Sequence, residues 1–585
     1  MLTPDKNAIP LPGENHENNW YNQDFDSFRI SEHVLFEKRP IRMRVVGAGA
    51  VGIQLLYKAQ QELENVEYFV YEKNQELGGT WLVNRYPGCT CDIPAHSYQF
   101  TWARNPNWSS FYAKSEEIWE YLKDTARRHD LERHIKYSHR VESARWSEQE
   151  GLWKLRVHGP EGDFEDECEI LVNGSGILDV PKLPDIPGIN KFEGEIMHSA
   201  SWDDRYDLEG KTVAVIGGGS SAVQIVPNIQ PKVKKLIPFL RSPVWVTTGF
   251  GAQYSGPGGT NFQYSAEQKK RFAEDPKHFD EYCRGLEGEL NKRFTLMHGK
   301  SQDQKQSRKF VAEKMEKEID GNEELSEHLI PQFPLGCRRM TPGEGYLKAL
   351  NAPNVHVVRE SVIKFTKNAV ADQSGNEYEV DAVICATGFE RLFSPHFECI
   401  GRNGVVLDEQ FGDHPKAYLA IMTQNFPNLF LVLGPNGPVS HGSLLPIFEW
   451  YTRYMFKMIN KLQRENIKSY EPKPEAMHDI YNYTHELFKR LVWSSVCRSW
   501  FKNGKIHGPV TAVYAGSRLH YFELMKEVRY EDYIIQYRSN NRFQFLGNGY
   551  TTTETSIDGN PVWYMDMLRD EDKLQQAERA EHEKS

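Results

Sequence analysis

Residues 41–52 read IRMRVVGAGAVG, an apolar, strand-like run that leads directly into Gly47, Gly49 and Gly52. A helix-compatible stretch follows, and a second apolar run, VEYFVYE, ends at Glu72. This order is typical of a dinucleotide-binding βαβ unit, because glycines let the backbone turn tightly and approach a pyrophosphate at the helix N-terminus. Glu72 lies 20 residues beyond Gly52, where a carboxylate can accept hydrogen bonds from ribose hydroxyls. A glycine turn with an unrelated surface glutamate fits this spacing less well.

A second unit of the same kind begins at KTVAVI, residues 211–216, and continues into GGGSSA. Its turn contains Gly217, Gly219, Ser220 and Ser221, and Ala222 replaces the third glycine with another small residue. The next strand ends 19 residues later in Arg241 rather than in an acid. A guanidinium pairs with a 2′-phosphate, which a carboxylate would repel, so the unit is expected to bind NADPH rather than NADH. The alternative is that Arg241 is only a solvent-facing strand end.

The two units organise the rest of the chain and predict an α/β fold with two Rossmann-like domains. We expect residues 41–180 and 381–530 to form the first domain, and residues 190–250 and 330–380 the second. Residues 251–329 are polar, charged and helix-compatible, which predicts an inserted helical subdomain. An N-terminal arm (1–40) and a C-terminal extension (531–585) complete the chain.

Composition excludes several other classes of protein. The formal net charge of −11 argues against a general nucleic-acid binder, which needs a basic field. The eight cysteines are scattered, and Cys89 and Cys91 have no second pair at zinc-ligand spacing, so we expect neither a secreted disulfide scaffold nor a metal site. The chain opens on a polar stretch, and no apolar run reaches the roughly 20 residues that span a bilayer, so we expect a cytoplasmic protein without membrane insertion.

Two further motifs lie between the two units, one directly after the first unit and one immediately before the second. The first, GGTWLVNRYPGCTCDIP (78–94), contains Gly79, Thr80, Trp81, Tyr86 and Asp92, and could line a flavin diphosphate or be a turn-rich loop. The second, FEGEIMHSASWDD (192–204), contains His198, which from the residues alone is more readily a packing histidine than a catalytic base.

Together these motifs resemble the signatures of type I Baeyer–Villiger monooxygenases, within the class B flavoprotein monooxygenases. The series FxGxxxHxxxWD runs from Phe192 to Asp203, and GGxW…YPGxxxD ends at Asp92. The resemblance extends from about Arg42 to Phe522 and is greatest to the fungal branch that processes secondary metabolites. It implies FAD in the first domain and NADPH in the second. It also implies a C4a-peroxyflavin, formed with O2, that inserts oxygen beside a ketone carbonyl to give an ester or lactone.

The resemblance also assigns roles to individual residues. In PLGCRRM (334–340), Arg339 would be the active-site arginine, Asp92 its carboxylate partner, and Arg338 a contact of the NADPH phosphate, although the family often has lysine there. Trp500 would contact the nicotinamide cofactor, and Thr387 and Gly388 would join the two cofactor domains. From the residues alone, the two arginines could be a basic surface turn and Trp500 a core residue.

Two other functions remain open at the level of sequence. The same cofactors could oxygenate a nitrogen or sulfur atom, although Arg339 and Asp92 favour the ketone because an added oxyanion needs a fixed positive donor. A flavin-binding protein without turnover is the other alternative, which the intact pair of nucleotide turns disfavours.

Overall fold

The computed structural model describes residues 20, 23–390, 393–440 and 442–570. The chain forms two compact units: a large one of residues 41–459 and 469–534, and a small one of residues 1–40, 460–468 and 535–585. The large unit contains both predicted βαβ units. Residues 1–19 and 21–22 of the predicted arm, and residues 571–585 of the predicted extension, lie outside the described residues.

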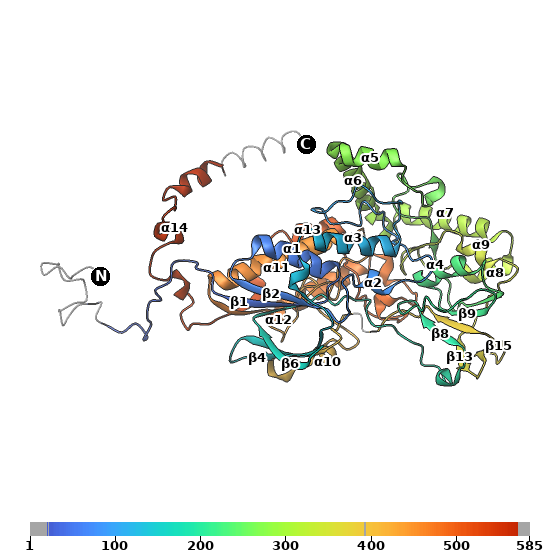
Figure 1. Cartoon of the computed structure of the whole chain (residues 1–585), viewed down its shortest axis with the longest axis horizontal. Coiled ribbons are helices and arrows are strands. Elements are labelled where there is room, and N and C mark those ends of the chain that lie inside the picture. The colour runs from blue at the N-terminus through green and yellow to red at the C-terminus, as the bar shows by residue number, and fades with distance from the viewer. Residues whose placement is uncertain (1–19, 21–22, 391–392, 441, 571–585) are drawn as a thin grey trace. The chain divides into compact units, whose positions relative to one another are not determined.

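The first βαβ unit builds a five-stranded parallel sheet (Figure 1). In spatial order its strands are β18 (Leu429–Leu431), β7 (Ile170–Asn173), β1 (Ile41–Val46), β2 (Val66–Tyr71) and β3 (Ile135–Lys136). Helix α1 (Ala50–Glu62) returns the chain from β1 to β2, whereas β7 lies on the other side of β1. The glycine turn after β1 therefore lies where the strand order reverses, which is the position at which parallel sheets bind ligands.

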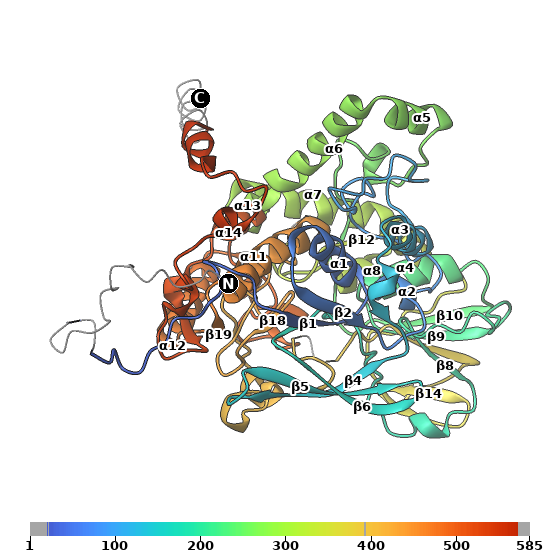
Figure 2. The same ribbon diagram turned by 60° about the vertical axis from the view of Figure 1, so that its left-hand side comes forward.

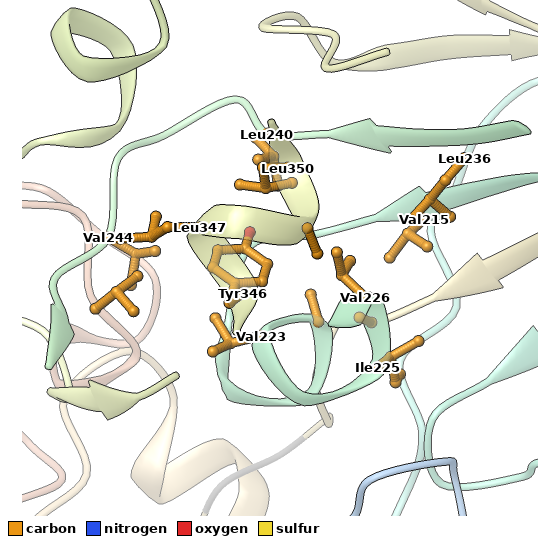
Figure 3. Packing of buried hydrophobic residues seen from close by; sticks show 14 of the residues in the cluster. Val215, Val223, Ile225, Val226, Leu236, Leu240, Val244, Tyr346, Leu347 and Leu350 are labelled. Atoms are coloured by element: carbon orange, nitrogen blue, oxygen red, sulfur yellow. The ribbon is translucent and has the colours of Figure 1, made fainter. Parts of the chain in front are cut away.

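The second βαβ unit builds a four-stranded parallel sheet. Its strands, in spatial order, are β10 (Lys235–Phe239), β9 (Thr212–Ile216), β16 (Ala382–Cys385) and β8 (Glu195–His198). Helices α4 (Ser220–Ile229) and α9 (Tyr346–Leu350) pack together over it, and Figure 3 shows Val223 and Val226 of α4 facing Tyr346 and Leu347 of α9. These side chains are buried, so the second glycine turn starts from a rigid core.

We expected the chain to return to the first domain at residue 381, and this prediction is wrong for strand β16. β16 pairs in parallel with both β8 and β9, so it belongs to the second sheet. Its four residues are all buried, and an apolar strand of this kind suits either parallel sheet, so composition could not assign it. The chain rejoins the first sheet only at β18.

Two further sheets extend the two parallel ones. One is mixed: β4 (Arg140–Ser147), β5 (Leu152–Gly159) and β6 (Gly162–Cys168) are antiparallel, and β17 (Glu398–Ile400) pairs with β4 in parallel. The other is antiparallel and contains β13 (Val362–Phe365), β14 (Ala369–Asp372) and β15 (Glu377–Glu379). Figures 1 and 2 show α1 and α3 (Ser115–Arg128) on one side of the first sheet and the β4–β6 sheet on the other. The first sheet is thus covered on both faces, as a parallel sheet requires.

The segment 251–329 is helical, as its sequence predicts. It contains α5 (Ala266–Glu274), α6 (Pro276–Asn291), α7 (Gln302–Ile319) and α8 (Glu323–Leu329). Ser265 and Ser301 cap α5 and α7 by accepting hydrogen bonds from backbone N–H groups of the first turn. Met315 of α7 and Leu325 of α8 belong to the core of the second sheet, so this part of the insert is continuous with the second domain.

The remaining helices and strands of the described residues are α2 (Thr80–Val83), β11 (Val246–Thr247), β12 (Thr341–Pro342), α10 (Leu407–Phe411), α11 (Leu445–Arg464), β19 (Ile467–Pro472), α12 (Pro474–Phe488), α13 (Arg518–Leu524), β20 (Tyr533–Tyr537) and α14 (Thr552–Thr555). Among the described residues, no helix combines the length and apolarity needed to cross a bilayer. The same residues contain no group of three or more His, Cys, Asp or Glu side chains placed to hold a metal ion.

Candidate active site

A single cavity of about 2050 Å³ in the large unit extends past both glycine turns. This volume is about twice the upper end of the range for one small-molecule site. Most of the residues that the sequence singles out are in its wall: Gly47, Gly49, Glu72, Gly79, Thr80, Trp81, Tyr86, Asp92, Gly219, Ser220, Ser221, Arg338, Arg339, Thr387, Gly388 and Trp500. Three others, Gly52, Gly217 and Arg241, are not part of the wall.

The first glycine turn presents bare backbone to this cavity. Gly47 has a φ of +102°, and a Cβ there would lie 2.7 Å from the carbonyl oxygen of Gly174. Gly49 and Gly79 face each other so closely that a Cβ on Gly79 would lie 3.1 Å from the Gly49 Cα. Gly52 instead packs against the Gly47 carbonyl, which explains its position outside the wall. The exposed N-terminus of α1 therefore fits a pyrophosphate, which needs close approach to backbone N–H groups.

Glu72 is held rigidly at the end of β2. Its Oε2 accepts a hydrogen bond from the Ala48 backbone N–H at 2.8 Å, and its Oε1 accepts from the backbone and side-chain nitrogens of Asn74 at 2.9 and 2.7 Å. A carboxylate has about four acceptor sites. Glu72 therefore retains acceptor capacity at the cavity wall, as a contact with ribose hydroxyls requires.

The second glycine turn leads into α4, whose first residue is Ser220. Nothing lies within 4 Å of the position that a Cβ on Gly219 would take, so this part of the turn is open. Gly217, with a φ of +122°, instead packs against the carbonyl of Ala386. The Ser220 hydroxyl lies 3.2 Å from that of Thr341, which fixes the turn against β12. The helix N-terminus is thus exposed to the cavity and suits a second anionic group.

Arg241 and Arg338 are close enough to repel each other. Burial lowers the pKa of Arg338, and the positive charge of Arg241 lowers it further. Nη1 of Arg338 donates to the Pro243 carbonyl at 2.8 Å, a neutral acceptor that does not compensate the charge. Two neighbouring guanidinium groups can bind an anion, and the 2′-phosphate contact expected for them stays a prediction.

Arg339 pairs with Asp92 inside the cavity. Its Nη2 donates to Asp92 Oδ2 at 2.5 Å, and the Asp92 carboxylate raises the pKa of the guanidinium. The Arg339 side chain is 34% exposed, and this exposed surface faces the cavity. The site therefore holds a permanent cation in the cavity wall, where its charge is less screened than in bulk water.

Gln224, which the motifs do not mark, joins the two domains. From α4 its Oε1 accepts a hydrogen bond from the Tyr86 hydroxyl at 2.7 Å, and its Nε2 donates to the backbone and hydroxyl oxygens of Thr90, both at 3.0 Å. Trp81 contributes to the same wall and donates from Nε1 to Tyr98 at 3.2 Å. Gln224 lies one turn after Ser221 on α4, between the apolar residues Val223 and Ile225, and nothing in its sequence position distinguishes it from the helix's other polar residues.

His198 is a packing residue, as expected from the residues alone. Its Nδ1 accepts a hydrogen bond from the Ala200 N–H at 3.0 Å, and burial lowers its pKa, so the ring is neutral. The nearby Thr387 hydroxyl donates to the Lys182 carbonyl, and the Lys182 N–H donates to the Gly388 carbonyl at 2.9 Å. Thr387 and Gly388 follow β16 of the second sheet. Their hydrogen bonds to Lys182 connect them to the segment that follows β7 of the first sheet.

A disulfide not anticipated from the sequence connects two parts of the wall. Cys337, immediately before Arg338 and Arg339, is bonded to Cys497, three residues before Trp500. Both cysteines are almost completely buried, whereas the Trp500 side chain is partly exposed in the cavity. Pairing between cysteines that are 160 residues apart cannot be deduced from their positions in the sequence.

These features define a class of protein: an oxidoreductase with two dinucleotide sites that open onto one cavity. The wall of that cavity contains an arginine, Arg339, that is ion-paired with Asp92. A family model described as "Flavin-binding monooxygenase-like" matches residues 40–255. The FAD-binding monooxygenase tazF of Aspergillus terreus is 39% identical over 536 residues, which cover 91% of this chain and 95% of that protein. A Baeyer–Villiger monooxygenase of Pseudomonas aeruginosa is 32% identical over 79% of this chain and 85% of its own.

Among solved structures, cyclohexanone monooxygenase from Rhodococcus sp. Phi1 bound to NADP+ matches with a TM-score of 0.74 and 26% identity. The match covers 86% of this chain and 100% of that one. The chain therefore belongs to the flavin-binding monooxygenase-like family and is a Baeyer–Villiger-type member of it. The predicted family, its fungal relatives, the two-domain α/β fold and the cofactor pair of FAD and NADP are confirmed by these similarities.

Proposed function

We propose that the chain uses NADPH, FAD and O2 to insert one oxygen atom beside the carbonyl of a bulky ketone of secondary metabolism, giving an ester or lactone. The observation that carries this proposal is the Arg339–Asp92 pair, exposed in a cavity onto which both nucleotide turns open. A bound flavin, reduced by NADPH, would supply the oxygen-transferring chemistry.

We assign FAD to the first sheet and NADPH to the second. Gly47, Gly49 and Gly79 would approach the FAD pyrophosphate, and Glu72 its ribose, because these residues line one side of the cavity. Thr80, Trp81, Tyr86 and Asp92 follow on the same loop. On the other side, Gly219, Ser220 and Ser221 at the start of α4 would hold the NADPH pyrophosphate, with Gly217 supporting the turn.

The remaining cofactor contacts are assigned from the charge or the position of the residues. Arg338, with Arg241 nearby, would bind the 2′-phosphate, because burial and the Arg241 charge both disfavour the Arg338 cation unless an anion accompanies it. Trp500 would contact the nicotinamide end of the cofactor, since it lies in the same wall as Arg339. Thr387 and Gly388 would lie between the two cofactors, next to the connection from β16 to the first domain.

Arg339 would act on the reacting oxygen atoms. It remains protonated at any working pH, and its free donors can stabilise the oxyanion that forms when oxygen adds to a ketone. Asp92 orients the guanidinium and raises its pKa. Oxygenation of an amine or sulfide, the second candidate, develops no carbonyl oxyanion and would leave this pair without a role.

The test is product identification. Purified, FAD-loaded enzyme would be incubated with NADPH, ¹⁸O2 and a panel of ketones, amines and sulfides, and the products identified by mass spectrometry. We expect an ester or lactone that carries one ¹⁸O atom. An N-oxide, hydroxylamine or sulfoxide as the sole product would reject the proposal in favour of the second candidate.

A cytoplasmic location is part of the proposal, although the Cys337–Cys497 disulfide bears on it. Disulfides are rare in reducing compartments. Both sulfur atoms are buried, which would protect the bond from soluble thiols. Fractionation of the producing cells, with alkylation of free thiols at lysis, would test both the location and the state of the bond.

A further inference from the structure

Besides Arg338 and Arg339, the wall of the cavity contains Arg293, which belongs to neither nucleotide turn. Arg293 belongs to the 3-10 helix Lys292–Met297, which continues α6 of the helical insert. Leu290, Leu296 and Met297, which lie beside it in the sequence, are also in the wall. No cofactor role assigned above involves this part of the insert, so its chemistry needs a separate explanation.

Arg293 has one carboxylate partner, Glu289, one helical turn earlier. The Glu289 side chain is 6% exposed, and its Oε2 also accepts a hydrogen bond from the Gln253 N–H at 3.3 Å. The Arg293 side chain is 43% exposed, and among the described residues Glu289 is its sole hydrogen-bonding or ionic partner. A guanidinium carries five N–H donors, so most of them are unsatisfied by the protein.

The position of Arg293 is close to the reacting end of the cavity. Met297, on the same 3-10 helix, packs against Gly336, where a Cβ would lie 3.2 Å from its sulfur atom. Gly336 is three residues before Arg339. The Tyr112 hydroxyl gives a second link: burial raises its pKa most, the carboxylates of Asp92 and Glu289 raise it further, and Arg293 lowers it. The charges of Asp92, Glu289 and Arg293 therefore all act on one hydroxyl group.

An ion pair with a half-exposed arginine is weak evidence for stability, because such pairs usually contribute little to the free energy of unfolding. Arg293 and Glu289 would be replaceable by apolar residues if they served packing alone. The arrangement repeats that of Arg339 and Asp92: a carboxylate holds one edge of the guanidinium, and the other edge faces the cavity. Such an edge recognises a planar oxygen acceptor, most strongly an anionic one.

We infer that Arg293 determines substrate specificity by binding an acidic oxygen group, a carboxylate or an ionised phenol, on the ketone substrate at a distance from its carbonyl. This inference rests on the proposed ketone oxidation and narrows its substrate class to ketones that carry such a group. Arg241 and Arg338 already supply cations for the cofactor phosphate, so Arg293 is available to the substrate.

The test uses three ketones that differ at one position: 4-phenylcyclohexanone, 4-(4-hydroxyphenyl)cyclohexanone and 4-(4-oxocyclohexyl)benzoate. Binding to the FAD-loaded enzyme with NADP+ is measured by calorimetry, and lactone formation by kcat/KM. The variants are Arg293→Met and Arg293→Lys. The control is Arg284→Met, which breaks a similar Arg–Asp pair at (i, i+4) spacing on α6, with Asp280, but lies outside the cavity wall.

We expect the wild type and Arg284→Met to prefer the carboxylate, the phenol or both over the phenyl ketone. Arg293→Met should lose about 10- to 100-fold of that preference, the range for a hydrogen bond to a charged group, and Arg293→Lys should regain part of it. Comparison of the benzoate ketone with the hydroxyphenyl ketone shows which acidic group Arg293 prefers.

Three outcomes would overturn the inference: a wild type that binds the three ketones equally, a preference unchanged in Arg293→Met, or a rise in the KM for NADPH as the main effect of the variant. Failure of the proposed function has a different signature, because the wild type would then convert none of the three ketones to a lactone while calorimetry still reports their binding.

Discussion

Removal of the Cys337–Cys497 disulfide is expected to weaken both the stability of the large unit and its hold on NADPH. The bond closes a loop of 160 residues, and the chain entropy that such a loop removes from the unfolded state corresponds to about 5 kcal/mol at 25 °C. The large unit contains roughly 485 residues, for which the entropy of unfolding is about 1 kcal/mol per degree. If the unit unfolds cooperatively, the expected loss is about 5 °C in Tm.

The perturbation is the double variant Cys337→Ala/Cys497→Ala, compared with wild-type protein before and after treatment with a dithiol under mildly denaturing conditions. Calorimetry would give Tm, and steady-state kinetics would give KM for NADPH. We expect reduced wild type and the double variant to have similarly lowered Tm values. The KM for NADPH should rise several-fold, because the bond connects the Arg338 turn to the Trp500 segment.

Dithiol treatment of the double variant is the control and should change neither quantity. An oxidised wild type with the same Tm as the double variant would refute the entropic argument. An unchanged KM with a lowered Tm would show that the bond stabilises the fold without positioning the cofactor wall.

The other predictions concern the two arginines and the turns. Arg339→Met should lower kcat/KM for ketone oxidation by about 10²- to 10³-fold, the cost of one oxyanion donor, measured from initial rates of ester formation; an unchanged kcat/KM would contradict its role. Asp92→Asn should lower the same ratio less, because the guanidinium remains but loses its orienting charge. Arg338→Met should raise the KM for NADPH about 10-fold or more and leave the KM for NADH nearly unchanged. An equal rise in both KM values would show that Arg338 does not bind the 2′-phosphate. Gly47→Ala should yield protein depleted of FAD, read from flavin absorbance, because the new Cβ would meet the Gly174 carbonyl at 2.7 Å.

Much of the fold followed from local patterns. The two strand–glycine–helix units are short in sequence, and each specifies its own turn, so Gly47 and Gly219 were predicted at the cavity from spacing alone. The insert was equally readable, because its polar stretches carry helix-compatible periodicity. What failed was the assignment of β16, since an apolar strand of four residues carries no mark of the sheet it joins.

The site itself was less accessible to sequence reasoning. Arg339 and Asp92 are 247 positions apart, and only the family resemblance connected them before the structure brought them to 2.5 Å. The link between Cys337 and Cys497 was not found at all, because disulfide connectivity depends on tertiary geometry. Arg293 was missed for a related reason: the residue lies in a charged helical segment, and only the fold shows that its side chain faces the cavity.

The loop of residues 78–94 explains why the two domains must be correctly docked for the chemistry to occur. It follows the first glycine unit, yet its side chains bond to the second domain: Tyr86 and Thr90 bind Gln224, and Asp92 binds Arg339. The arginine that would act on the reacting oxygen is thus oriented by a carboxylate from the opposite domain. A shift of about 1 Å between the domains would weaken that ion pair and the Gln224 hydrogen bonds together, because hydrogen bonds weaken steeply with distance. Gln224→Ala should therefore lower ester formation per NADPH although Gln224 touches none of the reacting atoms, and coupling equal to that of the wild type would show that Arg339 and Asp92 keep their geometry without this connection.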